Sequence, residues 1–172
     1  CAGPVGLLRP GAAPTCRWCG HGAAAHWTCP TCGGTRLRSS TVGARRTAEE
    51  LGRAFPGITV KTSGSGEVLA TVPADPVLVI ATPGAEPRAE GGYAAVLLLD
   101  AWTVLDRPAL DAAQEALRRW SGAAALARPG APVVIAGAPS GGPVPAIEAL
   151  IRWDPEWFAD RELTEREQLR LP

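Results

Sequence analysis

The sequence contains no methionine, a single lysine (Lys61) and a single tyrosine, and aromatic residues make up only 5% of it. It has no signal-peptide pattern, and no apolar run approaches the roughly 20 residues that a membrane-spanning helix needs. The glycine turns at 64–66 and 141–142 lack the Gly-Lys-Ser/Thr that a phosphate-binding loop requires. The overall composition is that of a globular protein. Because the chain begins with Cys1 and has no methionine, we expect it to be a segment of a longer protein.

Acidic residues are missing from the first 46 positions, which hold six arginines. Residues 47–172 carry 11 basic and 17 acidic side chains, so the net charge of zero is unevenly divided. One interpretation is that a basic N-terminal module makes any contact with phosphate groups. The other is that the arginines offset the negative charge of cysteine thiolates nearby.

All cysteines lie in the first 32 residues, at Cys1, Cys16, Cys19, Cys29 and Cys32. Four of them form two Cys-x-x-Cys pairs nine residues apart, and each pair is followed directly by glycine. This spacing lets one tight turn point both sulfurs at one ion, and the glycine lets backbone N–H groups approach the sulfurs. Paired motifs of this kind predict a closed, structural zinc site. The alternatives are a disulfide pair or four unrelated buried cysteines.

Residues 1–38 are rich in glycine and proline and have little periodicity, so we expect metal binding to supply their folding free energy. His21 and His26 lie between the pairs, and either histidine can replace a cysteine as a ligand. We expect at least one of them to be a surface residue. Trp18 and Trp27 are interpreted as covers for the metal site, with base stacking as the alternative.

From Thr41 onward the pattern changes to that of an α/β domain. Apolar runs at 76–82, 94–100 and 132–137 predict central parallel strands buried on both faces. Shorter strands are predicted at 58–60 and 67–72, with a polar turn at 61–66 between them. Helices are predicted at 47–55, 106–120, 144–153 and 155–169, with Asp106 capping the second. Alternating strands and helices predict a three-layer α/β fold with right-handed crossovers.

Three stretches together resemble the primosomal protein N-prime (PriA) family of superfamily-2 DNA helicases, which act in replication restart. The first is the cysteine series described above. The second is Gly43–Pro56, which is similar to the helix that enters that family's second helicase lobe. The third is Trp157–Arg166, with Leu171-Pro172 after it, which is similar to the family's closing helix before its C-terminal DNA-binding domain. Their order and spacing cover nearly the whole chain.

The resemblance implies a RecA-like, three-layer parallel-sheet lobe at 39–172, preceded by a truncated zinc-ribbon module at 1–38. The family binds two zinc ions through eight cysteines in interleaved pairs. By that pattern Cys1, Cys16 and Cys19 hold one ion, and Cys29 and Cys32 hold the other. The local alternative, in which Cys16, Cys19, Cys29 and Cys32 close a single site, stays open.

The same comparison indicates that the catalytic motifs of the second lobe are lost. Where the family has Gly-Thr-Gln and then Lys-Gly, residues 80–86 contain no lysine. Ala123 and Leu126 stand where two arginines would reach the γ-phosphate of ATP, and neither side chain can hydrogen-bond to a phosphate. ATP binding, if it occurs, is expected through a first lobe outside this chain, and enzymatic activity is left open.

The resemblance further implies binding to forked or single-stranded DNA, and contacts with other primosome proteins, the replicative helicase loader and single-strand-binding protein. It also implies a cytoplasmic, nucleoid-associated location without membrane contact. Two other functions remain open. One is a zinc-ribbon nucleic-acid module on an α/β domain in transcription or RNA processing. The other is a rubredoxin-like electron carrier, whose iron would make the protein red.

Overall fold

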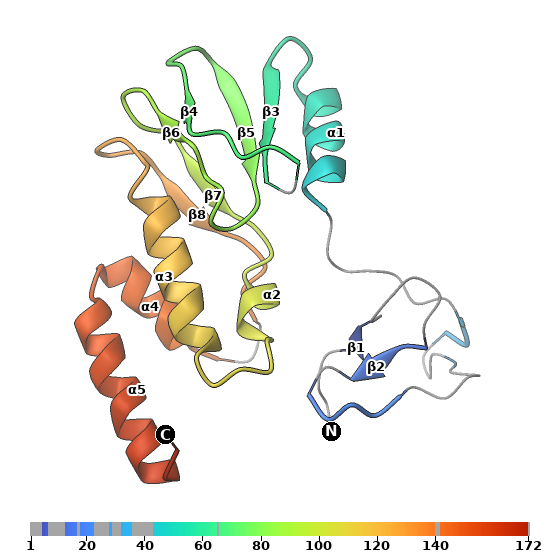
Figure 1. Cartoon of the computed structure of the whole chain (residues 1–172), viewed down its shortest axis with the longest axis vertical. Coiled ribbons are helices and arrows are strands. Elements are labelled where there is room, and N and C mark those ends of the chain that lie inside the picture. Colours follow the sequence, from blue (N-terminus) through green and yellow to red (C-terminus); the bar gives the residue numbers. More distant parts are fainter. Residues whose placement is uncertain are drawn as a thin grey trace.

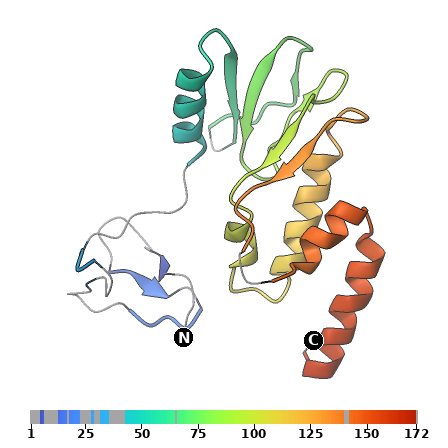
Figure 2. The same ribbon diagram turned by 180° about the vertical axis from the view of Figure 1, so that it is seen from behind.

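The structure is a computed structural model, and it describes residues 5–6, 13–16, 18–22, 28, 32–35, 43–64, 66–139 and 142–171. Cys1, Cys29, His26 and Trp27 lie outside these ranges. Two short antiparallel strands, β1 (Val5–Gly6) and β2 (Thr15–Cys16), belong to the cysteine-bearing segment. The rest is a mixed α/β domain, and in two opposite views the segment lies beside the end that carries α2 (Figures 1 and 2).

The α/β domain begins with α1 (Ala44–Ala54), which packs on β3 (Thr59–Ser63). The helix starts at Ala44 rather than the predicted Thr47, so its acids lie beyond the first turn. Those acids instead pair with arginines one turn earlier, as in Arg46–Glu50 at 2.8 Å. The helix ends before Pro56-Gly57, as predicted, and Gly57 takes a φ of 91°.

The strands of this domain pair in parallel, as the apolar runs predict. β3 pairs with β5 (Val77–Ala81), from Thr59 opposite Val77 to Ser63 opposite Ala81. The shorter β4 (Thr71–Val72) pairs with β6 (Arg88–Ala89), and β7 (Val96–Leu98) pairs with β8 (Val133–Ile135). The predicted turn at 61–66 is wrong in its first half, because β3 continues to Ser63, and only Thr71–Val72 of the strand predicted at 67–72 forms.

The core of the domain lies between β7 and three helices, α3 (Ala112–Ala124), α4 (Pro145–Arg152) and α5 (Pro155–Leu169). Small residues let these elements approach closely, and larger apolar residues fill the space between them. Its buried members are Leu98, Ala101, Ala116, Leu117, Trp120, Ala123, Ala124, Ala146, Ala149, Leu150 and Phe158. Both C-terminal helices have the predicted positions, each with proline in its first turn, and Asp154 accepts the N–H of Trp157 at 2.9 Å.

Two expectations for this region are wrong. The strands β7 and β8 are not buried on both faces, because Leu98 points into the core while Leu97 is 63% exposed and Val134 opposite it is also exposed. The helix predicted at 106–120 is also misplaced. Asp106 ends α2 (Trp102–Leu105) by donating its N–H to the carbonyl of Trp102, and residues 106–111 form a loop before α3.

In the ranges that the structure describes, none of the helices has the length and apolar character that crossing a bilayer requires.

Candidate metal-binding knuckle and the lobe surface

The first Cys-x-x-Cys pair forms a tight turn at the end of β2. The N–H of Cys16 donates to the carbonyl of His21 at 2.8 Å, and the N–H of Gly20 donates back to the carbonyl of Cys16 at 3.0 Å. Pairing of Thr15 with Gly22 closes the hairpin on its other side. The turn therefore brings Cys16 and Cys19 close together.

The Cys16 thiol lies in a setting that favours its thiolate form. The backbone N–H of Cys19, and next that of Trp18, lower the pKa of this thiol by hydrogen bonding to the sulfur. Cys16 is also buried. Of the cysteines that the structure describes, Cys16, Cys19 and Cys32, none is in a disulfide. A buried sulfur that receives backbone N–H groups matches the donor chemistry of a thiolate zinc site.

The glycines that follow the two pairs share one backbone conformation. Gly20 has a φ of 72° and Gly33 a φ of 67°, both in the left-handed region that glycine enters without steric cost. A Cβ on Gly34 would lie 3.4 Å from the sulfur of Cys32, so the chain passes close to this sulfur. Both glycines therefore turn the chain after their cysteine pair, and their predicted role in a metal site stays a prediction.

The structure places the predicted ligands in two groups. Cys16 and Cys19 share one turn, Cys32 lies in the described range 32–35, and Cys1 and Cys29 lie outside the described residues. Within those described ranges, no three His, Cys, Asp or Glu side chains come together in a group that could hold a metal ion. The five-cysteine ligand set and its pairing stay predictions. The side chain of His21 is exposed.

The turn that carries Cys16 and Cys19, called the knuckle below, is connected to the α/β domain by Trp18. Sequence reasoning missed this contact. Its indole N–H donates to the carbonyl of Asp106 at 3.3 Å, across 88 positions in the sequence. The ring remains 54% exposed. Neither interpretation of this tryptophan, as a metal-site cover or as a base-stacking group, predicts the contact. No local pattern signals a bond to a backbone carbonyl in a distant loop.

The segment expected to carry the phosphate-contacting arginines lies on α3 and just after it. Ala123 is only 7% exposed and belongs to the core, so this position does not face solvent. The nearby Arg118 and Arg119 both bind Glu115, at 2.7 and 2.5 Å. These bonds, to Arg118 first and then to Arg119, lower the pKa of Glu115 to about 2. The side chain of Arg118 is exposed, and that of Arg119 is half-buried.

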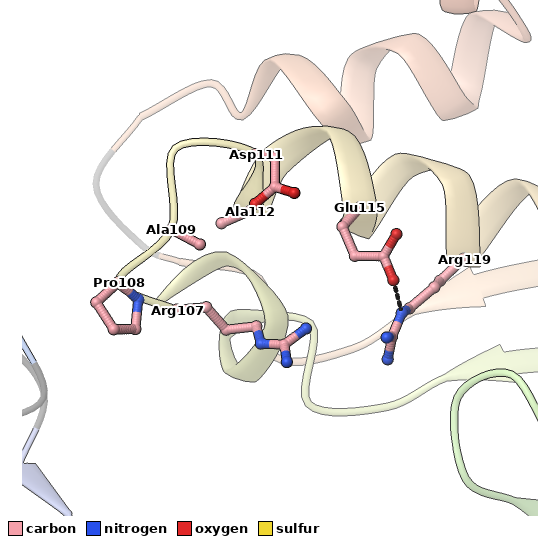
Figure 3. A pocket seen from close by; sticks show the side chains of 7 residues that line it. All are labelled: Arg107, Pro108, Ala109, Asp111, Ala112, Glu115 and Arg119. Atoms are coloured by element: carbon pink, nitrogen blue, oxygen red, sulfur yellow. Dashed lines mark hydrogen bonds and ion pairs between the residues drawn. The ribbon is translucent and has the colours of Figure 1, made fainter. Parts of the chain in front are cut away.

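Beside this ion pair lies an open hollow of about 510 Å³ at the start of α3 (Figure 3). Its walls come from the 106–111 loop and the first two turns of α3. Its lining residues are Arg107, Pro108, Ala109, Asp111, Ala112, Glu115 and Arg119. Two acidic and two basic side chains line this space, so its charge is mixed.

The fold and the knuckle define an α/β domain preceded by a cysteine-rich segment. No family model matches the chain. Over its whole length it is 49% identical to the probable replication restart protein PriA of Mycobacterium tuberculosis (strain CDC 1551 / Oshkosh) and, equally, to that of Mycobacterium leprae (strain TN). The chain spans 26% of the length of each. The sequence resemblance to PriA is therefore confirmed along the whole chain.

Proposed function

We propose that this chain is a zinc module and helicase-like lobe of a replication restart protein that binds stalled or abandoned forks and helps to reload the replicative helicase. The observation that carries this proposal is the 49% identity with proteins named PriA over the entire chain. An identity of this level that extends through both the cysteine-bearing segment and the α/β domain favours the two acting together. Forked or single-stranded DNA and other primosome proteins are the proposed partners.

The zinc part of the proposal is supported by the knuckle itself. Cys16 and Cys19 lie in one turn, the amides of Cys19 and Trp18 favour the Cys16 thiolate, and glycine turns the chain after each pair. Zinc held there would supply folding free energy to a segment with few apolar residues of its own. The thiolates of Cys1, Cys16, Cys19, Cys29 and Cys32 are the proposed ligands, divided between two ions or closing one.

The loss of ATP turnover is supported by the packing of α3. Ala123 is part of the core, so an arginine at this position could not reach a phosphate without disrupting the domain. Arg118 and Arg119 are engaged by Glu115 rather than directed at a ligand. Arginines that contact the transferred phosphate are worth about a thousand-fold or more in rate, so their loss leaves negligible turnover.

The proposal is tested on the full-length protein by measuring ATP hydrolysis with forked DNA and, in parallel, binding to the same labelled fork by fluorescence anisotropy. We expect fork binding without DNA-stimulated turnover. Changing both Cys29 and Cys32 to serine should release metal and weaken binding. The variant Gln168→Ala, which alters an exposed residue of α5 outside the cysteine pairs and outside the basic first 46 residues, is the matched control. Robust turnover that Arg119→Ala abolishes would contradict the proposed loss of activity.

A further inference from the structure

The loop at residues 106–111 is held from two sides by elements that are distant in sequence. On one side, the indole N–H of Trp18 donates to the carbonyl of Asp106 at 3.3 Å. On the other, the guanidinium Nη2 of Arg166, on α5, donates to the carbonyl of Leu110 at 3.1 Å. The loop also forms one wall of the hollow at the start of α3 (Figure 3).

Trp18 contacts both the knuckle and the 106–111 loop, so a change in the conformation of the knuckle can alter the conformation of the loop. Its own backbone N–H points to the sulfur of Cys16, and its side chain ends on the carbonyl of Asp106. A metal ion that fixes Cys16 and Cys19 would therefore fix the backbone of Trp18 between them and, through the indole, one end of the loop. Without the ion, the turn that carries Trp18 would keep its backbone hydrogen bonds and the contacts at the Cys16 sulfur, but no metal ion would link its two cysteines.

We propose that Trp18 is a positioning residue through which metal occupancy of the knuckle orders the 106–111 loop, and with it the hollow and the contact to α5. This inference rests on the proposed metal site. It assigns to Trp18 a role that neither covering the metal nor stacking on a base requires. The loop in turn carries the ordering to α5 through the bond between Arg166 and Leu110.

Hydrogen exchange of the whole chain, measured by mass spectrometry with zinc bound and after stripping by a chelator, tests the coupling. In the wild type we expect amides of residues 106–111 to exchange about two- to ten-fold more slowly with zinc, since one hydrogen bond is worth about that factor. In Trp18→Phe, which keeps a ring but removes the N–H, this zinc-dependent difference should disappear. If Trp18 had only a structural role, Trp18→Phe would change the exchange rate equally with and without zinc, and the zinc-dependent difference would remain.

Trp153→Phe is the matched control, because Trp153 is similarly exposed, at 58%, and lies at the end of α4. This variant should keep the whole zinc-dependent difference. Zinc content is measured on the same samples by elemental analysis. If the chain binds zinc but the amides of the loop exchange equally fast with and without zinc, the coupling is wrong and the proposed metal site is still supported. A chain that binds no zinc overturns both, and a difference that persists in Trp18→Phe overturns the role of Trp18.

Discussion

At the scale of single residues, the positions after the two cysteine pairs, Gly20 and Gly33, have the strictest backbone requirement. Both have φ near 70°, and a Cβ at either position would meet nothing within 4 Å, so backbone conformation alone requires glycine there. Replacing Gly33 with alanine should therefore cost about 1–2 kcal/mol and weaken zinc binding about five- to thirty-fold. Competition with a chromophoric chelator measures this affinity.

Gly22→Ala is the matched control for that experiment. It lies in the same segment, also has open space where the alanine methyl group would lie, and does not have a φ in the left-handed region. We expect its zinc affinity to equal that of the wild type. If Gly33→Ala and Gly22→Ala bind zinc equally well, the left-handed turn does not contribute to the site.

Glu115 gives a pH-dependent prediction, because Arg118 and then Arg119 lower its pKa from 4.5 to about 2. The native state binds this proton less readily than the unfolded chain, so the ionised carboxylate stabilises the fold above pH about 4.5. That contribution is lost as the pH falls from about 4.5 toward 2. The stability difference between the wild type and Glu115→Gln, measured by urea unfolding, should be constant above pH 5 and shrink in that window. A difference that does not change with pH would contradict the ion pairing.

At the scale of elements, the C-terminal end of α3 has a buried alanine and, just after it, an exposed one. Ala123 lies in the core, whereas Ala125, the residue that follows the helix, is exposed. An arginine at 123 would bury an unpaired charge and overfill the core, so Ala123→Arg should destabilise the domain by at least about 3 kcal/mol. Ala125→Arg should change stability by no more than about 0.5 kcal/mol. Thermal unfolding distinguishes them, and equal melting temperatures would show that position 123 faces solvent.

The end of β3 depends on one buried hydroxyl. Ser63 is fully buried, donates its O–H to the carbonyl of Ala85 at 2.6 Å and accepts the N–H of Leu69 at 3.0 Å. Ser63→Ala would leave both groups without this partner and should cost about 1–3 kcal/mol of unfolding free energy. Thr62→Ala, at the exposed neighbouring position of the same strand, should cost less. Equal losses in urea unfolding would argue against the bridging role of Ser63.

How much of the fold follows from sequence differs from element to element. Positions of α4 and α5 were predictable because local signals agree, with Pro145 and Pro155 at the helix starts and Asp154 as a cap. The 102–111 region was not predictable, because Asp106 is suited by its side chain to begin a helix, whereas in the fold it ends α2 through its backbone N–H. Exposure of Leu97 was also missed, since an apolar run alone does not show which strand face is covered.

Some features of the candidate site were also predictable from the sequence, and others were not. The left-handed glycine after each cysteine pair was predictable, because a tight turn imposes a backbone conformation that glycine adopts most easily. The bond from Trp18 to Asp106 was not, since its acceptor is a backbone carbonyl that any residue type supplies. Burial of Ala123 was likewise missed, because alignment with a helicase motif assigns a residue to a position but does not show which way it faces.

At the scale of the whole molecule, a basic cysteine-bearing segment meets an acidic α/β domain through a contact at the 106–111 loop. The two parts contribute differently to folding. The domain has its own apolar core, whereas we propose that the segment depends on its thiolates. Removing metal should therefore affect the segment and the loop while α3, α4 and α5 keep their structure.

The most direct test of this account is the metal content of the purified protein, measured by elemental analysis before and after changing Cys29 and Cys32 to serine. We predict zinc at about one ion per chain or more, colourless protein, and a loss of zinc in the double variant while the helical circular dichroism signal persists. Metal-free wild-type protein that is nevertheless fully folded, or equal zinc in the wild type and the variant, would contradict the central claim.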